Sequence, residues 1–347
     1  MIRSILATLA MIGPAWAGDP PAIVHVSTSM ATDSRQIRQF SFDGDASTFF
    51  ASSGKPRATD HFTLVLDRPV AIDSVAVDTG RPDGGDRLDD GLLEVSADGR
   101  AFEEIARFSG GSARAETKGR AVRAIRLRPG CDMGHPLAIR EITLGSVEKV
   151  PTFRYPIEFA VDVADAPDMK EWADNVAGLC ERWNPRICEA LHTDGDKPPT
   201  SVTIVLSASY KGVAMAGGGQ ITGSVKYFKA HPDDLGAMIH ETVHIVQRYR
   251  GRGNPSWLGE GVADYYRFFV YEPGKAGPVN PTRAHYHDSY RTTATFLAYL
   301  IQTYDKQIVF KLHRLMREGR YQEAAFQEIT GKSVQELGEE WLASLRK

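Results

Sequence analysis

The spacing of hydrophobic residues changes near residue 150, and this change divides the chain into two regions of different fold class. Before it, short alternating apolar runs such as "HFTLVLDRPV", "IDSVAVDTG" and "AVRAIRLRPG" are separated by turn-forming residues. This pattern predicts an all-β antiparallel sandwich of the jelly-roll type. After it, helical spacing dominates around a few short apolar strands, which predicts an α+β domain.

A chain of 347 residues is too long for one ordinary core, so two domains are expected. The predicted organisation is a signal peptide at 1–17, a β-sandwich at 22–147, a linker at 148–156 and a second domain at 157–347. Arg3, the apolar run 5–12 and the small residues Ala15 and Ala17 predict the signal peptide. We therefore expect a secreted or periplasmic protein, with no membrane span.

Charge and cysteine content say less about function. The net charge is −3 and both signs are interspersed, so no basic field favours nucleic acid. Three cysteines leave at least one outside any internal disulfide. Cys180 and Cys188 share a predicted helix at a separation of about 12 Å, beyond disulfide reach unless Pro185 bends the helix. The sequence leaves that pairing open.

The segment "HETVH" carries the strongest chemical signal. His240 and His244 are four residues apart, so both imidazoles lie on one face of a helix and can bind one metal ion. Glu241 lies beside them, where it can act as a general base toward water. The alternative is a surface helix with two solvated histidines.

A second helix, "WLGEGVADYYRFF", follows this motif. A catalytic zinc takes three protein ligands and keeps one position open. Glu260 is the predicted third ligand, because Gly259 and Gly261 would let this helix approach the metal closely. Asp264 lies one turn further on the same face, where its carboxylate could orient a metal-bound histidine.

About residues 155–347 resemble the basic secretory protein family of plants and bacteria, and more widely the His-Glu-x-x-His…Glu (gluzincin-type) peptidases. The resemblance rests on "HPDDLGAMIHETVHIVQ", "WLGEGVADYYR", "SYRTTATFLAYL" and "FQEITGKSVQELGEEW". It implies a zincin-like α+β fold and a peptidase. It also implies that His240, His244 and Glu260 bind zinc and that Glu241 is the base.

About residues 22–147 resemble the discoidin-like (coagulation factor C-type, galactose-binding-like) sandwich, through "FDGDASTFF", "RLDDGLLEVSADGRAFEEIA" and "IREITL". The resemblance implies a glycan or cell-surface ligand, often with a structural calcium nearby. Asp43, Asp45, Thr48 and Glu141 supply oxygen ligands suited to calcium. Ordinary turn capping is the alternative for these four residues.

Tyr290 is the predicted donor to the oxyanion that forms when water attacks a peptide carbonyl. It begins a predicted amphipathic helix, and the basic secretory family has a tyrosine at the matching point of its Gly-Tyr-Asp-x-Thr-Ala-x-Phe-Leu stretch. Ser289 and Arg291 replace that glycine and aspartate here. A core role for Tyr290 is the alternative, and His287 would then be the next candidate.

Together these features predict a secreted zinc metallopeptidase that hydrolyses peptide bonds through a zinc-activated water and carries a glycan- or surface-binding module. We expect a monomer acting on a protein or peptide. Residues 217–228, "GGGQITGSVKYF", are predicted to form an edge strand that holds the substrate. The alternative function is a non-catalytic surface- or glycan-binding protein with a peptidase-like zinc domain. Hydrolysis of a non-peptide bond such as an ester uses the same chemistry.

Overall fold

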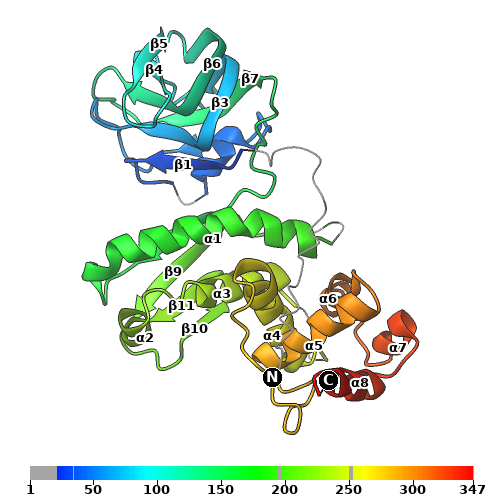
Figure 1. Ribbon diagram of the computed structural model, residues 1–347. Helices are drawn as coiled ribbons and strands as arrows, with labels where there is room; N and C mark the ends of the chain where they lie inside the picture. Colours follow the sequence, from blue (N-terminus) through cyan, green and yellow to red (C-terminus); the bar gives the residue numbers. More distant parts are fainter. Residues whose placement is uncertain (1–21, 34, 194, 196, 250–252, 347) are drawn as a thin grey trace, which may run out of the picture.

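The computed structural model describes residues 22–33, 35–193, 195, 197–249 and 253–346. The predicted signal peptide at 1–17 lies outside the described residues. Two domains follow each other along the chain, an all-β domain and an α+β domain, so the predicted fold class is confirmed (Figure 1). No helix in the described part of the chain is both long enough and apolar enough to cross a membrane.

The N-terminal domain is an antiparallel β-sandwich. Its strands are β1 (Val24–Thr28), β2 (Phe50–Ala51), β3 (Phe62–Thr79), β4 (Gly91–Ser96), β5 (Glu103–Arg107), β6 (Ser112–Pro129) and β7 (Ala138–Ser146). They pair in the order β2-β7-β3-β6-β4-β5, and β1 also pairs with β3. The register of β3 against β6 shifts between Val65 and Val70 and again between Ile72 and Ser74. Such irregularities bend a strand, which allows both halves of β3 and β6 to contribute to the two layers.

Alternating side chains fill the space between the layers of the sandwich. Phe62, Leu64 and Leu66 on β3 are completely buried, and so are Leu93 on β4 and Ile125 on β6. Because successive side chains of a strand point to opposite faces, this alternation places one face of each strand in a common core.

The C-terminal domain combines a four-stranded sheet with a set of helices. Its strands are β8 (Glu158–Asp162), β9 (Ser201–Ser207), β10 (Ala214–Gly217) and β11 (Gln220–Ser224), and its helices are α1 (Lys170–Leu191), α2 (Val225–Ala230), α3 (Gly236–Gln247), α4 (Ser256–Tyr265), α5 (Tyr290–Thr303), α6 (Ile308–Arg317), α7 (Ala325–Thr330) and α8 (Val334–Ser344). The strand order is β10-β11-β9-β8. In Figure 1, α1 lies between the sandwich and this sheet, and α3 lies beside β10 and β11.

The edge strand next to the motif helix differs from the prediction. Residues 217–228 were expected to form it, but β11 pairs with both β9 and β10, so β10 is the edge. From Val225 onward the chain is helical, because the Ser224 side chain accepts a hydrogen bond from the Tyr227 amide and caps α2. The four residues of β10 are small or flexible and show little alternation of apolar and polar side chains. The sequence pattern therefore does not predict this strand.

Buried polar contacts join the two domains. Arg38 begins the 3-10 helix Arg38–Phe42 between β1 and β2 and forms an ion pair with Glu181 on α1. The Glu181 carboxylate also accepts a hydrogen bond from the Phe159 amide at 3.0 Å. The Gln39 side chain accepts a hydrogen bond from the Ile157 amide at 2.9 Å. Glu181 and Gln39 are buried, so the sandwich is anchored to α1 and β8 rather than connected by the linker alone.

Helix α1 also carries two of the cysteines. Cys180 and Cys188 are both buried and pack into different core clusters, one beside the sheet and one among the C-terminal helices. Pro185 lies inside α1 without ending it. The helix thereby bridges both halves of the core of this domain.

Candidate metal centre

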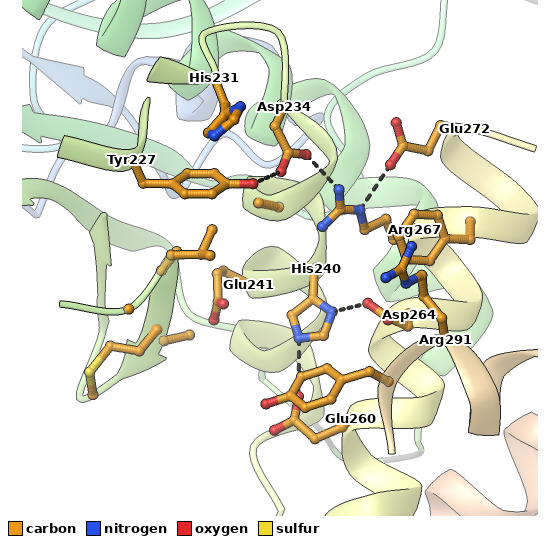
Figure 2. Close-up of a pocket in the computed structure, with 18 of the residues that line it drawn as sticks. Tyr227, His231, Asp234, His240, Glu241, Glu260, Asp264, Arg267, Glu272 and Arg291 are labelled. Atoms are coloured by element: carbon orange, nitrogen blue, oxygen red, sulfur yellow. Dashed lines mark hydrogen bonds and ion pairs between the residues drawn. The ribbon is translucent and has the colours of Figure 1, made fainter. Parts of the chain in front are cut away.

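Three predicted ligands meet where α3 faces α4. His240 Nε2 lies 3.1 Å from His244 Nε2 and 3.1 Å from Glu260 Oε2, and His244 Nε2 lies 3.4 Å from the same Glu260 oxygen. Among the described residues, these three form the one group of His, Cys, Asp or Glu side chains whose ligand atoms lie close enough together to hold a metal ion. Figure 2 shows His240 and Glu260 facing each other across this gap.

The outer nitrogens of both histidines are held by acceptors. Asp264 Oδ1 lies 2.6 Å from His240 Nδ1, and Gln247 Oε1 lies 2.7 Å from His244 Nδ1. Gln247 donates its own Nε2 to the Gly259 carbonyl, which fixes its oxygen toward His244. Each Nδ1 therefore carries a proton, and each Nε2 is the nitrogen that faces the gap, where it can bind a metal ion once its own proton has left. Two lone pairs and a carboxylate oxygen at this separation suit a zinc ion.

The electrostatics of the site favour a cation. Burial lowers the pKa of His240, but the contacts with Asp264 and Glu260 outweigh it and raise that pKa to about 9. Burial also acts to raise the pKa of Glu260, yet the two imidazoles hold it down at about 2. Without a metal the cluster thus takes up a proton, and a divalent cation would compete for the same place.

The helices are positioned by packing that the sequence suggested only in part. Every residue of α3 except His244 is buried, so the motif helix is a core element and not a surface helix. A Cβ on Gly261 would lie 2.1 Å from Thr293 Cγ2, whereas a Cβ on Gly259 would meet only ordinary contacts at 3.5 Å. Gly261 therefore brings α4 against α5, and the predicted role of both glycines in approaching the metal is wrong.

Glu241 lies at the floor of a cavity of about 1120 Å³ beside the ligands. Burial raises the pKa of its carboxyl, and the two imidazoles and the Ala216 amide on β10 oppose that shift without cancelling it. The edge strand β10 forms one wall of the cavity, and the helical segments α4 and α5 form the other. A buried carboxyl at the mouth of a metal site, facing an open cavity, can exchange a proton with a bound molecule.

Tyr290 also lines this cavity, at the first residue of α5. Its ring stacks against His240 with centroids 6.1 Å apart, and its side chain is 55% exposed. The alternative role as a core residue is therefore wrong. Ser289 and Tyr290 both have positive φ, 62° and 49°, a conformation that costs free energy for residues other than glycine and is frequent at functional sites. His285 and His287 do not line the cavity.

Comparison with known proteins identifies the domain that holds this centre. Residues 171–341 match the family model described as BSP, peptidase of plants and bacteria. The match lies entirely within the C-terminal domain. The match includes both helices of the metal centre and the start of α5, so the family covers every residue of the cluster. Among curated proteins, no match to the chain is found.

The N-terminal domain is similar to carbohydrate-binding modules of known structure. A module from a family 31 glycoside hydrolase of Clostridium perfringens is 18% identical, with 35% of this chain and 94% of that chain covered and a TM-score of 0.31. A pectin-binding module is 22% identical over 39% of this chain and 98% of that chain, with a TM-score of 0.29. A Streptococcus pneumoniae fucose-binding module is 14% identical over 35% and 93%, with a TM-score of 0.30. The sandwich fold itself is established by the strand pairing described above.

The polar wall of the cavity in the BSP domain was not predicted. Arg267 bonds to Asp234 and to Glu272, and Tyr227 donates its hydroxyl to Asp234 at 2.7 Å (Figure 2). Asp234 lies two residues before the start of α3, and Arg267 lies in the π-helical segment Tyr266–Tyr271 that follows α4. These residues have no motif spacing in the sequence, and only the fold brings them together. The sequence offered only two separate charged residues as a sign of this contact, Asp234 before α3 and Arg267 after α4.

The proposed calcium ligands of the sandwich are only partly assembled. Thr48 donates to Asp43 at 2.9 Å, while the Asp45 side chain bonds to Ser47. Burial and the nearby Asp43 charge raise the pKa of Glu141 to about 7, and Glu141 Oε2 is buried without a hydrogen-bond partner. Two neighbouring carboxyls with an unpartnered oxygen suit a cation. The turn-capping alternative accounts for Asp45 and Thr48 but not for Glu141.

Proposed function

We propose that this protein is a secreted, zinc-dependent metallopeptidase. The observation that carries the proposal is the convergence of two imidazole lone pairs and one carboxylate oxygen within 3.1–3.4 Å at the edge of an open cavity. The peptidase family of this domain supports it. Export is supported by the sequence of residues 1–17, and glycan binding by the resemblance of the sandwich to galactose-binding-like domains.

In this proposal His240, His244 and Glu260 hold the ion, and Asp264 and Gln247 keep both imidazoles in the ligating orientation. The zinc ion supplies a Lewis acid that polarises the scissile carbonyl and lowers the pKa of water. Glu241 accepts a proton from the attacking water and returns it to the leaving amine, a role that its raised pKa suits. The Tyr290 hydroxyl donates a hydrogen bond to the carbonyl oxygen as negative charge develops there.

The substrate in this proposal lies along β10 in an extended conformation. β10 pairs with β11 on one side only, so its other side offers backbone groups to an additional strand. Val213 and Met215 are 38% and 51% exposed beside the cavity, which gives apolar contact for peptide side chains. This assigns to β10 the role that was predicted for residues 217–228.

The alternative is a binding protein that uses the same domain without turnover. Glu241 argues against it, because burying this carboxyl costs free energy although it lies outside the group of metal ligands. A binding surface would be more stable with an apolar residue at that position.

The test is hydrolysis of a diverse peptide pool by the full-length protein and by its Glu241→Gln variant. The variant keeps the size and hydrogen bonding of the side chain but loses the base, so zinc content should be unchanged while turnover falls by at least about 10²-fold. Addition of a chelator should abolish turnover by the unmodified protein. Equal turnover by both proteins, or turnover that a chelator leaves intact, would contradict the proposed function.

A further inference from the structure

Arg291 is a cation on the wall of the cavity that has no acidic partner among the described residues. It is the second residue of α5, directly after Tyr290, and it lines the cavity that holds the metal centre. Within the described parts of the chain, no carboxylate lies within ion-pair distance of its guanidinium. Figure 2 shows the guanidinium beside Arg267 and near Asp264, whose carboxylate is hydrogen-bonded to His240.

The Arg291 guanidinium lies over an aromatic ring of the cavity wall. Phe268 is buried, and the guanidinium carbons of Arg267 and Arg291 lie 4.5 Å and 5.8 Å from its ring centroid. Contact with a ring face holds a guanidinium in place and leaves its N–H groups free to donate in the ring plane. The Arg291 side chain is exposed and lines the cavity, and it forms no ion pair with any described residue.

The neighbouring cations of the cavity are neutralised, and Arg291 is not. Arg267 is bonded to both Asp234 and Glu272, and Lys275 forms a second ion pair with Glu272 at 3.1 Å. The positive charges of Arg267 and Lys275 are therefore paired with carboxylates of the chain itself. Arg291 remains available for an acid that the substrate brings.

A second, smaller cavity next to the main one is also lined by arginine side chains. A smaller cavity of about 320 Å³ shares Arg291 with the main cavity and is also lined by Arg283, which forms no ion pair with any described residue. Asp288, also in its lining, accepts a hydrogen bond from the His285 amide. A side chain that reaches past Arg291 would therefore enter a region where two arginines lack acidic partners.

We propose that Arg291 selects peptides that carry an aspartate or glutamate close to the scissile bond. The guanidinium would bind the substrate carboxylate through two parallel N–H···O hydrogen bonds, a geometry that a lysine could not reproduce. Asp233, in the loop before α3, also lines the main cavity and forms no ion pair with any described residue. Its negative charge would repel an acidic side chain, so the acidic preference is expected only at the substrate position beside Arg291. This inference rests on the proposed peptidase function.

The test uses fluorogenic peptides of one sequence in which glutamate or its neutral isostere glutamine occupies each position around the cleaved bond in turn. At one position the unmodified protein should cleave the glutamate peptide with a kcat/KM about ten-fold above that of the glutamine peptide. Arg291→Gln should bring this ratio close to one, because kcat/KM for the glutamate peptide falls far more than kcat/KM for the glutamine peptide. Arg291→Lys, which keeps the charge but not the planar fork, should retain a smaller preference.

Lys275→Gln is the matched control, because it removes the same unit charge from the same cavity where that charge is already paired. It should keep the full preference for glutamate. The inference is overturned if no position shows a preference, if Arg291→Gln keeps the ratio, or if Lys275→Gln removes it equally. Chelator-sensitive cleavage of the glutamine peptide in any of these cases would leave the proposed function intact, whereas the absence of all cleavage would contradict both.

Discussion

Removal of the Arg38 charge should destabilise the chain far more than removal of an ordinary surface arginine. Arg38 pairs with Glu181, whose side chain is only 9% exposed and otherwise accepts just the Phe159 amide. Burial raises the pKa of Glu181, and Arg38 is the largest influence that opposes this shift. In Arg38→Met the carboxylate would be buried without its cation, which costs about 3–5 kcal/mol when a pair is fully buried. Since Arg38 is 22% exposed, we expect about 3 kcal/mol at pH 7.

Equilibrium unfolding in urea, followed by circular dichroism, measures this loss for the transition that includes α1. Arg154→Met is the matched control, because Arg154 pairs with Glu189 at 3.1 Å but both side chains are about two-thirds exposed, at 68% and 67%. That variant should lose less than about 1 kcal/mol. The double variant Arg38→Met/Glu181→Met should recover most of the stability, because both buried charges are then absent.

The pH dependence gives a further check on the same reasoning. Without Arg38, the pKa of Glu181 rises further above its unfolded value, so the folded state binds a proton that the unfolded state releases. The penalty of Arg38→Met should therefore be full above that raised pKa and should shrink as the pH falls through it. Equal losses for Arg38→Met and Arg154→Met at pH 7 would refute the view that this pair anchors the sandwich to α1.

Three further substitutions test individual contacts. Asp264→Asn weakens the acceptor that orients His240, so zinc affinity measured by competition with a chelator should fall about 10–100-fold while the fold is kept. Tyr290→Phe removes a hydroxyl from a largely exposed side chain, so kcat should fall about 10²-fold at constant zinc content and melting temperature; an unchanged kcat would assign the oxyanion contact to another residue. The raised pKa of Glu141, about 7, means that the folded state keeps a proton which the unfolded state releases. Stability should thus decline by about 1–2 kcal/mol between pH 4.5 and 7 after discounting for the half-exposed setting, and either calcium or Glu141→Gln should remove this slope in melting curves.

The sequence predicted those parts of the site that local geometry determines. His240 and His244 share a helix face because their spacing is one helical turn, and Glu260 and Asp264 share a face of the next helix for the same reason. Their meeting required only that two consecutive helices pack together. The structure brings all four side chains into contact.

Features that depend on distant contacts could not be predicted in the same way. β10 was overlooked because Ala214 to Gly217 carry no alternating pattern, and their strand conformation comes from pairing with β11. The ion pair of Arg267 with Asp234 joins residues that are 33 positions apart and lie on different helical segments. The positive φ angles of Ser289 and Tyr290 also could not be predicted, because no glycine marks these positions in the sequence.

Zinc titration of the metal-free protein tests whether peptide hydrolysis depends on one zinc ion bound by His240, His244 and Glu260. Bound zinc and the rate of peptide hydrolysis would be measured on the same samples as zinc is added, with His240→Ala and His231→Ala as variants. Activity should rise linearly and stop at one equivalent for the unmodified protein and for His231→Ala, whose histidine lies outside the ligand cluster. His240→Ala should bind no stoichiometric zinc and show no activity. Hydrolysis by the metal-free protein, or one equivalent of tightly bound zinc in His240→Ala, would contradict the account.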